Sequence, residues 1–194
     1  NIESIYCYMF HSFDDYLEYC YDFREDLRIL KNKKLIRKIG VSLNSNFEIE
    51  QVIDDNIIDI IQLPFNLLDN YNLRSETLTK AKNSGIEIHT RSVFLQGLFF
   101  KERNTFSEQL RPLKRYLEII DKYLDDNLKI NTLALNYVCS QKFIDKVLIG
   151  VDNYNHLKEN LSCLCKNIPE DIYLKINSIS VDEVNLLNPA TWKN

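Results

Sequence analysis

His11 is the residue whose type and position first indicate chemistry. It directly follows residues 4–10, a short apolar and aromatic run that is typical of a buried strand. An imidazole at the end of a strand can donate a hydrogen bond to a developing alkoxide and can assist proton transfer. A lone histidine is also commonly a satisfied side chain at the rim of a sheet, so His11 alone does not define a site.

Residues 85–98 form a second stretch whose residue types indicate a ligand-binding site. Residues 86–90 alternate apolar and polar side chains, which is the period of a strand, and the strand ends in Arg91 and Ser92. An apolar loop follows and closes at Gly97, which permits a close approach of the backbone. In α/β sheets, polar strand ends followed by glycine-containing loops commonly present a ligand site.

The elements that must position these residues alternate along the chain. The predicted strands are residues 4–10, 36–43, 57–63, 86–91 and 146–150, and the predicted helices are 13–30, 47–54, 75–84, 112–124, 133–141 and 155–163. Residues 66–72 are predicted to form a polar loop, and the tail is predicted to contain loops and one short amphipathic piece at 181–187. Apolar strands that alternate with helices predict an α/β protein with a parallel sheet built from right-handed crossovers.

Composition limits the classes of function. The chain has 194 residues, of which 45% are hydrophobic, and a formal net charge of -4, which gives no electrostatic case for a nucleic-acid partner. No apolar run is long enough for a membrane span, so we expect no membrane partner. Five cysteines without a CxxC pair favour reduced thiols in the cytoplasm, and no His or Cys spacing indicates a metal site. The chain begins with Asn, so we expect a fragment or a processed product.

A series of short motifs, taken in order along the chain, resembles the sequence of a known family. They are MFHSFDDY at 9–16, IRKIGVSL at 36–43, DIIQLPFNLLD at 59–69, RSVFLQGLFF at 91–100, LALNYVCSQ at 133–141, KVLIGVDNYNHLKENL at 146–161 and NPATW at 188–192. Together they resemble the C-terminal part of an aldo-keto reductase of the bacterial branch, over residues 5–192.

This resemblance implies a fold and an activity. The fold would be strands four to eight of a TIM-type (β/α)8 barrel, as a single incomplete domain over residues 1–194 that lacks the N-terminal three β/α units. The activity would be that of an NAD(P)-dependent oxidoreductase, which reduces an aldehyde or ketone by hydride transfer. The family's proton-donating Tyr and its supporting Asp and Lys would lie on the absent part, so we expect this chain alone to be inactive. The alternative is a non-catalytic barrel remnant or partner protein.

The resemblance also assigns roles to residues. His11 matches the catalytic histidine that orients the carbonyl substrate. The residues that match cofactor-binding positions are Ser42, Gln62, Arg91, Ser92, Phe94, Gln96, Gly150, Asn153, His156, Glu159 and Asn160. Among these, Ser42 and Gln62 would bind the nicotinamide carboxamide, and Arg91 would stack on the nicotinamide ring.

The motifs depart from the family's pattern in two places. Leu43 stands where the family often has Asn, which puts the contact of Ser42 with the carboxamide in doubt. Basic residues that would bind a 2′-phosphate are absent near His156, so the cofactor is NADP or NAD. The expected partners are a small-molecule carbonyl substrate and either the missing N-terminal half or a second copy of the chain. The identity of the substrate does not follow from the sequence.

Overall fold

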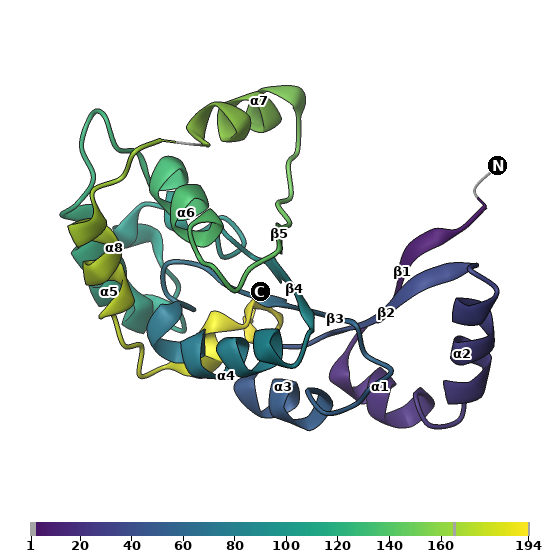
Figure 1. The fold of residues 1–194 in the computed structure, drawn as a ribbon. Coiled ribbons are helices and arrows are strands. Elements are labelled where there is room, and N and C mark those ends of the chain that lie inside the picture. The colour runs from purple at the N-terminus through teal and green to yellow at the C-terminus, as the bar shows by residue number, and fades with distance from the viewer. Residues whose placement is uncertain (1–2, 165, 194) are drawn as a thin grey trace. The chain divides into compact units, whose positions relative to one another are not determined.

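The computed structural model describes residues 3–164 and 166–193 (Figure 1). These residues divide into two compact units. The first unit comprises the described residues up to Leu63 together with Glu76–His89 and Phe143–Lys146. The second comprises Pro64–Ser75, Thr90–Lys142 and the described residues from Val147 onward.

The first unit contains all or part of each strand of a five-stranded sheet, whose order is β1-β2-β3-β4-β5. The strands are β1 (Ile5–Phe10), β2 (Ile36–Ser42), β3 (Ile60–Pro64), β4 (Glu87–Arg91) and β5 (Lys146–Val147). β1 pairs in parallel with β2, and β2 pairs in parallel with β3. The predicted parallel sheet is therefore confirmed.

Helices in the first unit begin where the sequence provides caps. Ser12 accepts a hydrogen bond from Asp15 N at the start of α1 (Phe13–Tyr19), and Ser45 does the same from Glu48 N at the start of α3 (Asn46–Val52). These side-chain oxygens satisfy amides that have no partner inside the helix. The third crossover helix, α4 (Tyr71–Asn83), ends before Gly85. This glycine has a φ of +84° and turns the chain at little conformational cost.

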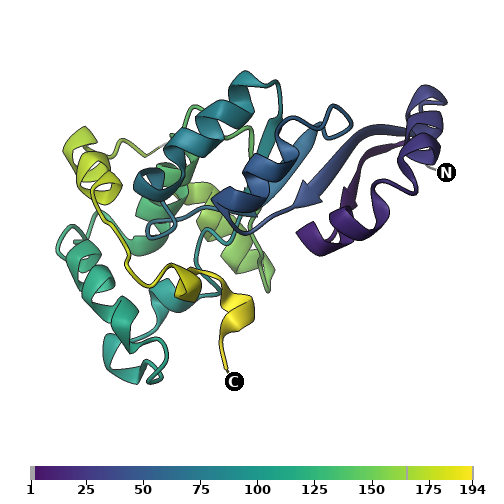
Figure 2. The ribbon, with the colours of Figure 1, turned by 90° about the horizontal axis from the view of Figure 1, so that it is seen from below.

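The prediction of one helix over residues 13–30 is wrong. The structure has α1 and then a separate α2 (Arg24–Asn32), which packs against β2 (Figure 2). A shared acceptor explains the break: Tyr16 Oη donates to Asp55 at 2.7 Å, and the Arg24 guanidinium binds the same carboxylate at 2.9 and 2.6 Å. Each helix is therefore tied to Asp55 separately, and a turn at residues 20–23 joins them.

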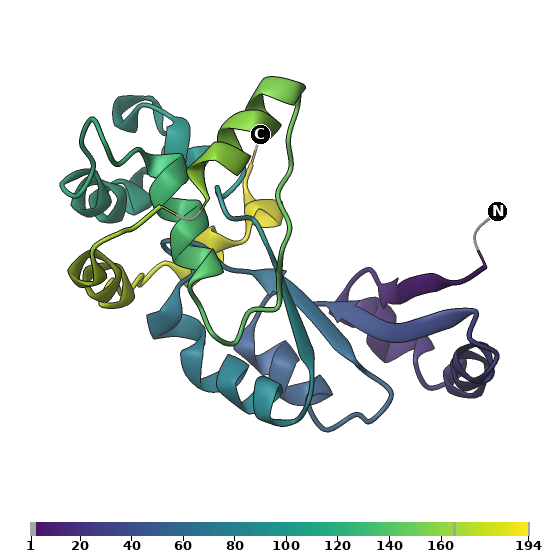
Figure 3. The same cartoon turned by 45° about the horizontal axis from the view of Figure 1, so that its top comes forward.

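The second unit is mainly helical. Its helices are α5 (Lys114–Asp121), α6 (Ile130–Cys139), α7 (Tyr154–Cys163) and α8 (Glu170–Asn177), with short 3-10 helices at Leu98–Phe100, Arg103–Thr105, Arg111–Leu113, Val184–Leu187 and Pro189–Thr191. Helix α6 packs against α7 (Figure 3). The buried Tyr137 of α6 stacks on Phe65, accepts a hydrogen bond from Tyr71 N at 3.0 Å and donates one to Asn177 Oδ1 at 2.7 Å.

Two sequence predictions in the second unit need correction. Residues 170–177, predicted to belong to a tail of loops, form helix α8, which is short and buries only Ile176. The strand predicted at residues 146–150 ends at Val147. After Leu148 N donates to Thr90 O at 2.7 Å, the chain leaves the ladder and becomes available to line a cavity.

In the first unit, the carboxylate of Glu87 joins several strands. Tyr6 Oη of β1 donates to its Oε2 at 2.8 Å, and His89 Nε2 lies 2.7 Å from its Oε1. Lys38 of β2 also binds it, and Lys146 Nζ of β5 lies 3.0 Å from Oε1. Burial alone would raise the pKa of Glu87, but hydrogen bonds from His89, Lys38, Tyr6 and Lys146 hold that pKa far below its ordinary value of 4.5.

Replacing Glu87 with Gln should therefore destabilise the protein in a pH-dependent way. Because the pKa of Glu87 is lower in the folded state than in the unfolded state, its carboxylate stabilises the fold at pH values above the unfolded-state pKa. This stabilisation is lost as the pH falls below about 4.5. We expect Glu87→Gln to lower the free energy of unfolding by about 1–3 kcal/mol near neutral pH. Urea unfolding followed by circular dichroism, at about pH 7 and about pH 3, measures this difference.

The matched control is Glu76→Gln, which removes an exposed carboxylate that pairs with Lys80 on α4. An exposed i,i+4 pair contributes little to stability, so this change should be small. If the effect of Glu87→Gln were the same size at both pH values, the assigned electrostatic role would be wrong.

Candidate functional site

The second unit contains a cavity of about 650 Å³. The segments that form it are the loop that follows β4, the chain that follows β5 and helix α7. Its lining residues are Ser92, Val93, Phe94, Gln96, Gly97, Phe100, Leu148, Ile149, Gly150, Asp152, His156, Glu159 and Asn160. Its volume lies within the range of pockets that bind small molecules and cofactors.

Most of the predicted cofactor-binding residues of this unit line the cavity. They are Ser92, Phe94, Gln96, Gly150, His156, Glu159 and Asn160. Arg91 and Asn153 are their direct neighbours: Arg91 NH1 donates to Ser92 Oγ at 3.4 Å, and Asn153 caps α7 by accepting from His156 N at 3.0 Å. Segments far apart in the sequence therefore meet around one space.

The loop over residues 92–97 has an unusual backbone. Ser92, Leu95 and Gln96 have φ values of +61°, +46° and +51°, and Gly97 has a φ of +77°. For residues with a Cβ atom, this left-handed region costs roughly 1–2 kcal/mol each. The sequence indicated a special conformation only at Gly97, because the other three residues have no intrinsic preference for positive φ.

The hydrogen bonds of this loop leave several donors available. Leu95 N donates to Ser92 O at 2.9 Å, which closes a tight turn. Across the described residues, no acceptor is found for the amide N–H groups of Val93, Phe94, Gln96 and Gly97, all of which line the cavity. Backbone amides in left-handed turns can bind an anion.

Carboxylates and an imidazole lie on the other side of the cavity. Asp152 precedes α7, Glu159 lies on it, and His156 Nδ1 is 3.6 Å from Asp152 Oδ2. Within the part of the chain that the structure describes, no lysine or arginine lines the cavity. Asn160 is 8% exposed and its carboxamide makes no hydrogen bond to another described residue, so a ligand could bind it.

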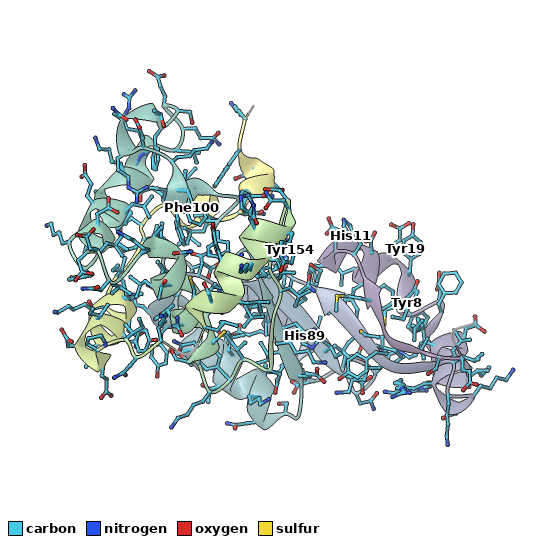
Figure 4. All side chains as sticks on the ribbon, turned by 90° about the horizontal axis from the view of Figure 1, so that it is seen from above. Tyr8, His11, Tyr19, His89, Phe100 and Tyr154 are labelled. Carbon is cyan, nitrogen blue, oxygen red and sulfur yellow. The ribbon has the colours of Figure 1, made fainter. Side chains whose placement is uncertain are left out.

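Apolar residues complete the lining. The ring centroids of Phe94 and Phe100 lie 5.2 Å apart, and Figure 4 labels Phe100. Leu148 and Ile149 follow β5. The predicted site residues do not include the lining residues Val93, Phe100, Leu148, Ile149 and Asp152. In the sequence, only their position next to predicted residues indicates a role for them. Leu148 and Ile149 also belong to a predicted strand that ends earlier in the structure.

The remaining predicted residues, His11, Ser42 and Gln62, belong to the first unit. Ser42 pairs with Gln62 across the sheet, and Phe10 pairs with Val41, so His11 follows β1 at the level of Ser42. Figure 4 labels His11 with Tyr8 and Tyr19, and these three residues help line a groove of about 280 Å³. Parallel pairing thus brings these three predicted residues to the same end of their strands.

A metal site is not supported by the described residues. They contain no group of three or more His, Cys, Asp or Glu side chains that could hold an ion. Every helix in the described part is also too short or too polar to cross a lipid bilayer.

Comparison with known proteins identifies the family. The model of the Aldo/keto reductase family matches residues 1–181. This chain belongs to the aldo/keto reductase family. The membership in this family that the sequence motifs predicted is therefore confirmed, and none of the curated proteins matches the chain significantly.

Solved aldo-keto reductases share the fold of this chain. The holo form of AKR11C1 from Bacillus halodurans is 19% identical, with a TM-score of 0.71, and the match covers 93% of this chain and 61% of that protein. Its apo form gives the same identity and TM-score and is covered over 65% of its length. MGS-M4, from a Medee basin deep-sea metagenome library, is 14% identical, with a TM-score of 0.62, and the match covers 93% of this chain and 62% of MGS-M4. This aldo-keto reductase chain thus spans about three fifths of the length of these structures.

Two glycines of the cavity allow the backbone strain to be tested. A Cβ atom added at Gly97 or at Gly150 would meet no atom within 4 Å, but only Gly97 has a positive φ. We expect Gly97→Ala to lower the free energy of unfolding by about 1–2 kcal/mol, because alanine is strained in the left-handed region. Gly150→Ala should leave it nearly unchanged, and equal losses for the two variants in thermal unfolding would contradict this explanation.

Proposed function

We propose that residues 1–194 are the cofactor-binding part of an NAD(P)-dependent reductase that reduces an aldehyde or ketone by hydride transfer. The observation that carries this proposal is the cavity of the second unit, in which the loop after β4, the chain after β5 and α7 meet. Family membership supports the reaction class in general.

The donor set of the cavity fits a dinucleotide. The amides of Val93, Phe94, Gln96 and Gly97 would bind the pyrophosphate, because amides without an acceptor favour an anion. The Asn160 carboxamide would bind the adenine, and a carboxylate such as that of Glu159 can accept hydrogen bonds from ribose hydroxyls. The bound nicotinamide supplies the hydride.

Residues of the first unit would orient the reacting groups. We propose that His11 donates a hydrogen bond to the carbonyl oxygen of the substrate, and that Ser42 and Gln62 bind the nicotinamide carboxamide, which has both a donor and an acceptor. Arg91, in the second unit, would stack its guanidinium plane on the nicotinamide ring. The parallel register that aligns His11, Ser42 and Gln62 supports the roles of those three residues.

The catalytic machinery would be incomplete in these residues. We propose that the strands correspond to the fourth to eighth strands of the family's barrel, and that the proton-donating Tyr, with its Asp and Lys, lies on three further β/α units. β1 is an edge strand, and its Ile5, Tyr6 and Tyr8 are 42–46% exposed. Its free edge would pair with that missing half or with a second copy of the chain. We also propose a cytoplasmic location, which the cysteine pattern supports.

Nucleotide binding is the direct test. NADH and NADPH are titrated into the chain, and nicotinamide fluorescence and the melting temperature are recorded. We expect saturable binding with a rise in melting temperature. NADH should bind at least as tightly as NADPH, because Asp152 and Glu159 would repel an additional phosphate.

The matched variants are Asn160→Ala, which removes a carboxamide from the cavity, and Asn155→Ala, which changes an exposed residue of α7 that does not line it. We expect the first to weaken binding about tenfold and the second to have little effect. If the unmodified chain bound neither nucleotide, the assignment of the cavity would be wrong.

A measurement of turnover distinguishes a reductase from a non-catalytic barrel remnant. We expect the chain alone to give no loss of nicotinamide absorbance with a generic aldehyde, because lack of the proton donor reduces the rate by roughly 10²–10⁴. A version extended upstream to include the missing units should be active. Similar rates for both versions would place the proton donor within residues 1–194, and an inactive extended version would favour the non-catalytic alternative.

A further inference from the structure

The turn that follows β3 contains a buried asparagine with several hydrogen bonds. Asn66 is completely buried. Its Oδ1 accepts hydrogen bonds from Leu68 N at 2.9 Å and from Asp69 N at 3.0 Å, and its own N–H donates to Asp69 O at 2.8 Å. The orientation of the Asn66 carboxamide is therefore fixed by the backbone of its own turn.

The other end of the Asn66 carboxamide reaches the cavity loop. Its Nδ2 donates to Ser92 O at 3.1 Å, across 26 positions of sequence. The same carbonyl accepts the Leu95 N–H at 2.9 Å. Asn66 thus binds the carbonyl oxygen on which the tight turn of the loop closes.

A buried ion pair also stabilises this turn. The Arg74 guanidinium binds Asp69 in a bidentate manner, with Nε–Oδ1 and NH2–Oδ2 distances of 2.6 and 2.9 Å. Both side chains are at most 3% exposed. Because charged groups this deeply buried require each other, the pair has one stable arrangement, and it fixes the segment that carries Asn66.

The loop needs external support to keep its shape. Ser92, Leu95 and Gln96 are left-handed without being glycine, and such residues persist only where the surroundings impose the conformation. The buried side chains of Leu95 and Leu98 anchor the far end of the loop, and Asn66 holds its beginning. Without the Asn66 donor, Ser92 would be free to return to an ordinary backbone conformation.

We propose that Asn66 is a positioning residue for the cofactor: through Ser92 O it holds residues 92–97 in the conformation that presents their free amides to the pyrophosphate. This inference rests on the proposed function, because it takes the cavity to be the nucleotide site. Asn66 does not line the cavity, so it acts through the loop and makes no contact with the ligand.

Asn66→Asp tests this role, and Asn70→Asp is its matched control. Aspartate at position 66 keeps the acceptor oxygen for Leu68 and Asp69 but loses the donor to Ser92 O. Asn70 is as buried as Asn66, and its Nδ2 donates to Leu67 O, Ile176 O and Ile179 O at 3.3, 2.9 and 3.0 Å, away from residues 92–97. Both variants bury a carboxylate and should lower the melting temperature.

Two readouts distinguish positioning from general destabilisation, both taken at a temperature at which both variants are folded. We expect the affinity for NADH to fall about tenfold in Asn66→Asp and to stay within about twofold of the unmodified chain in Asn70→Asp. Without nucleotide, hydrogen exchange at Leu95 N should become faster only in Asn66→Asp, because the acceptor of that amide is Ser92 O. If a variant fails to fold, Asn66→Ala and Asn70→Ala are compared in the same way.

Equal losses of affinity in the two variants, or unchanged exchange at Leu95 in Asn66→Asp, would overturn the positioning role. If the unmodified chain bound no nucleotide, the proposed function and the cofactor role of Asn66 would both fall. The exchange measurement would then still decide whether Asn66 holds the loop.

Discussion

The parallel pairing of β1, β2 and β3 is the constraint that aligns the predicted site residues of the first unit. Parallel strands place all their carboxyl ends at one edge of a sheet, and each return to the opposite edge requires a crossover. The register aligns Ser42 with Gln62 and brings the end of β1 level with them, so His11 follows at the same edge. Polar residues that are far apart in sequence become neighbours through backbone hydrogen bonding alone.

Buried charged side chains stabilise the two units in different ways. In the first unit, Glu87 gathers Tyr6, Lys38, His89 and Lys146 from several strands, so one carboxylate links the sheet across its width. In the second unit, the Asp69–Arg74 pair is local and almost fully buried, and it fixes a single turn. Burial raises the pKa of Asp69 and Arg74 opposes this rise, whereas the many donors to Glu87 lower its pKa.

Packed neighbours hold a strained loop of the second unit in its conformation. A loop with left-handed residues at Ser92, Leu95, Gln96 and Gly97 has amides that its own turns do not use. Such a conformation is unfavourable in isolation, and burial of the Leu95 side chain together with the buried neighbour Asn66 offsets its cost. Rigid support of this kind suits a site that must present donors to an anion before the anion arrives.

The sequence by itself determined those features that depend on neighbouring residues. Strand and helix periodicity predicted the parallel sheet, because this periodicity depends on a few adjacent side chains. Ordered motifs such as RSVFLQG at 91–97 also predicted the family.

Only the tertiary structure decided which polar residues are buried and which backbone is strained. Residues 66–72 are predicted to form a polar loop, yet Asn66, Asp69 and Asn70 are at most 1% exposed. Asn66 and Asn70 donate to carbonyl oxygens that are distant in sequence, and Asp69 pairs with the nearby Arg74. The break between α1 and α2 depends on Asp55, and the early end of β5 was likewise not visible in its own apolar sequence. The left-handed conformations of Ser92, Leu95 and Gln96 have no local signal, since these residue types prefer negative φ and adopt positive values only under the constraint of packed neighbours.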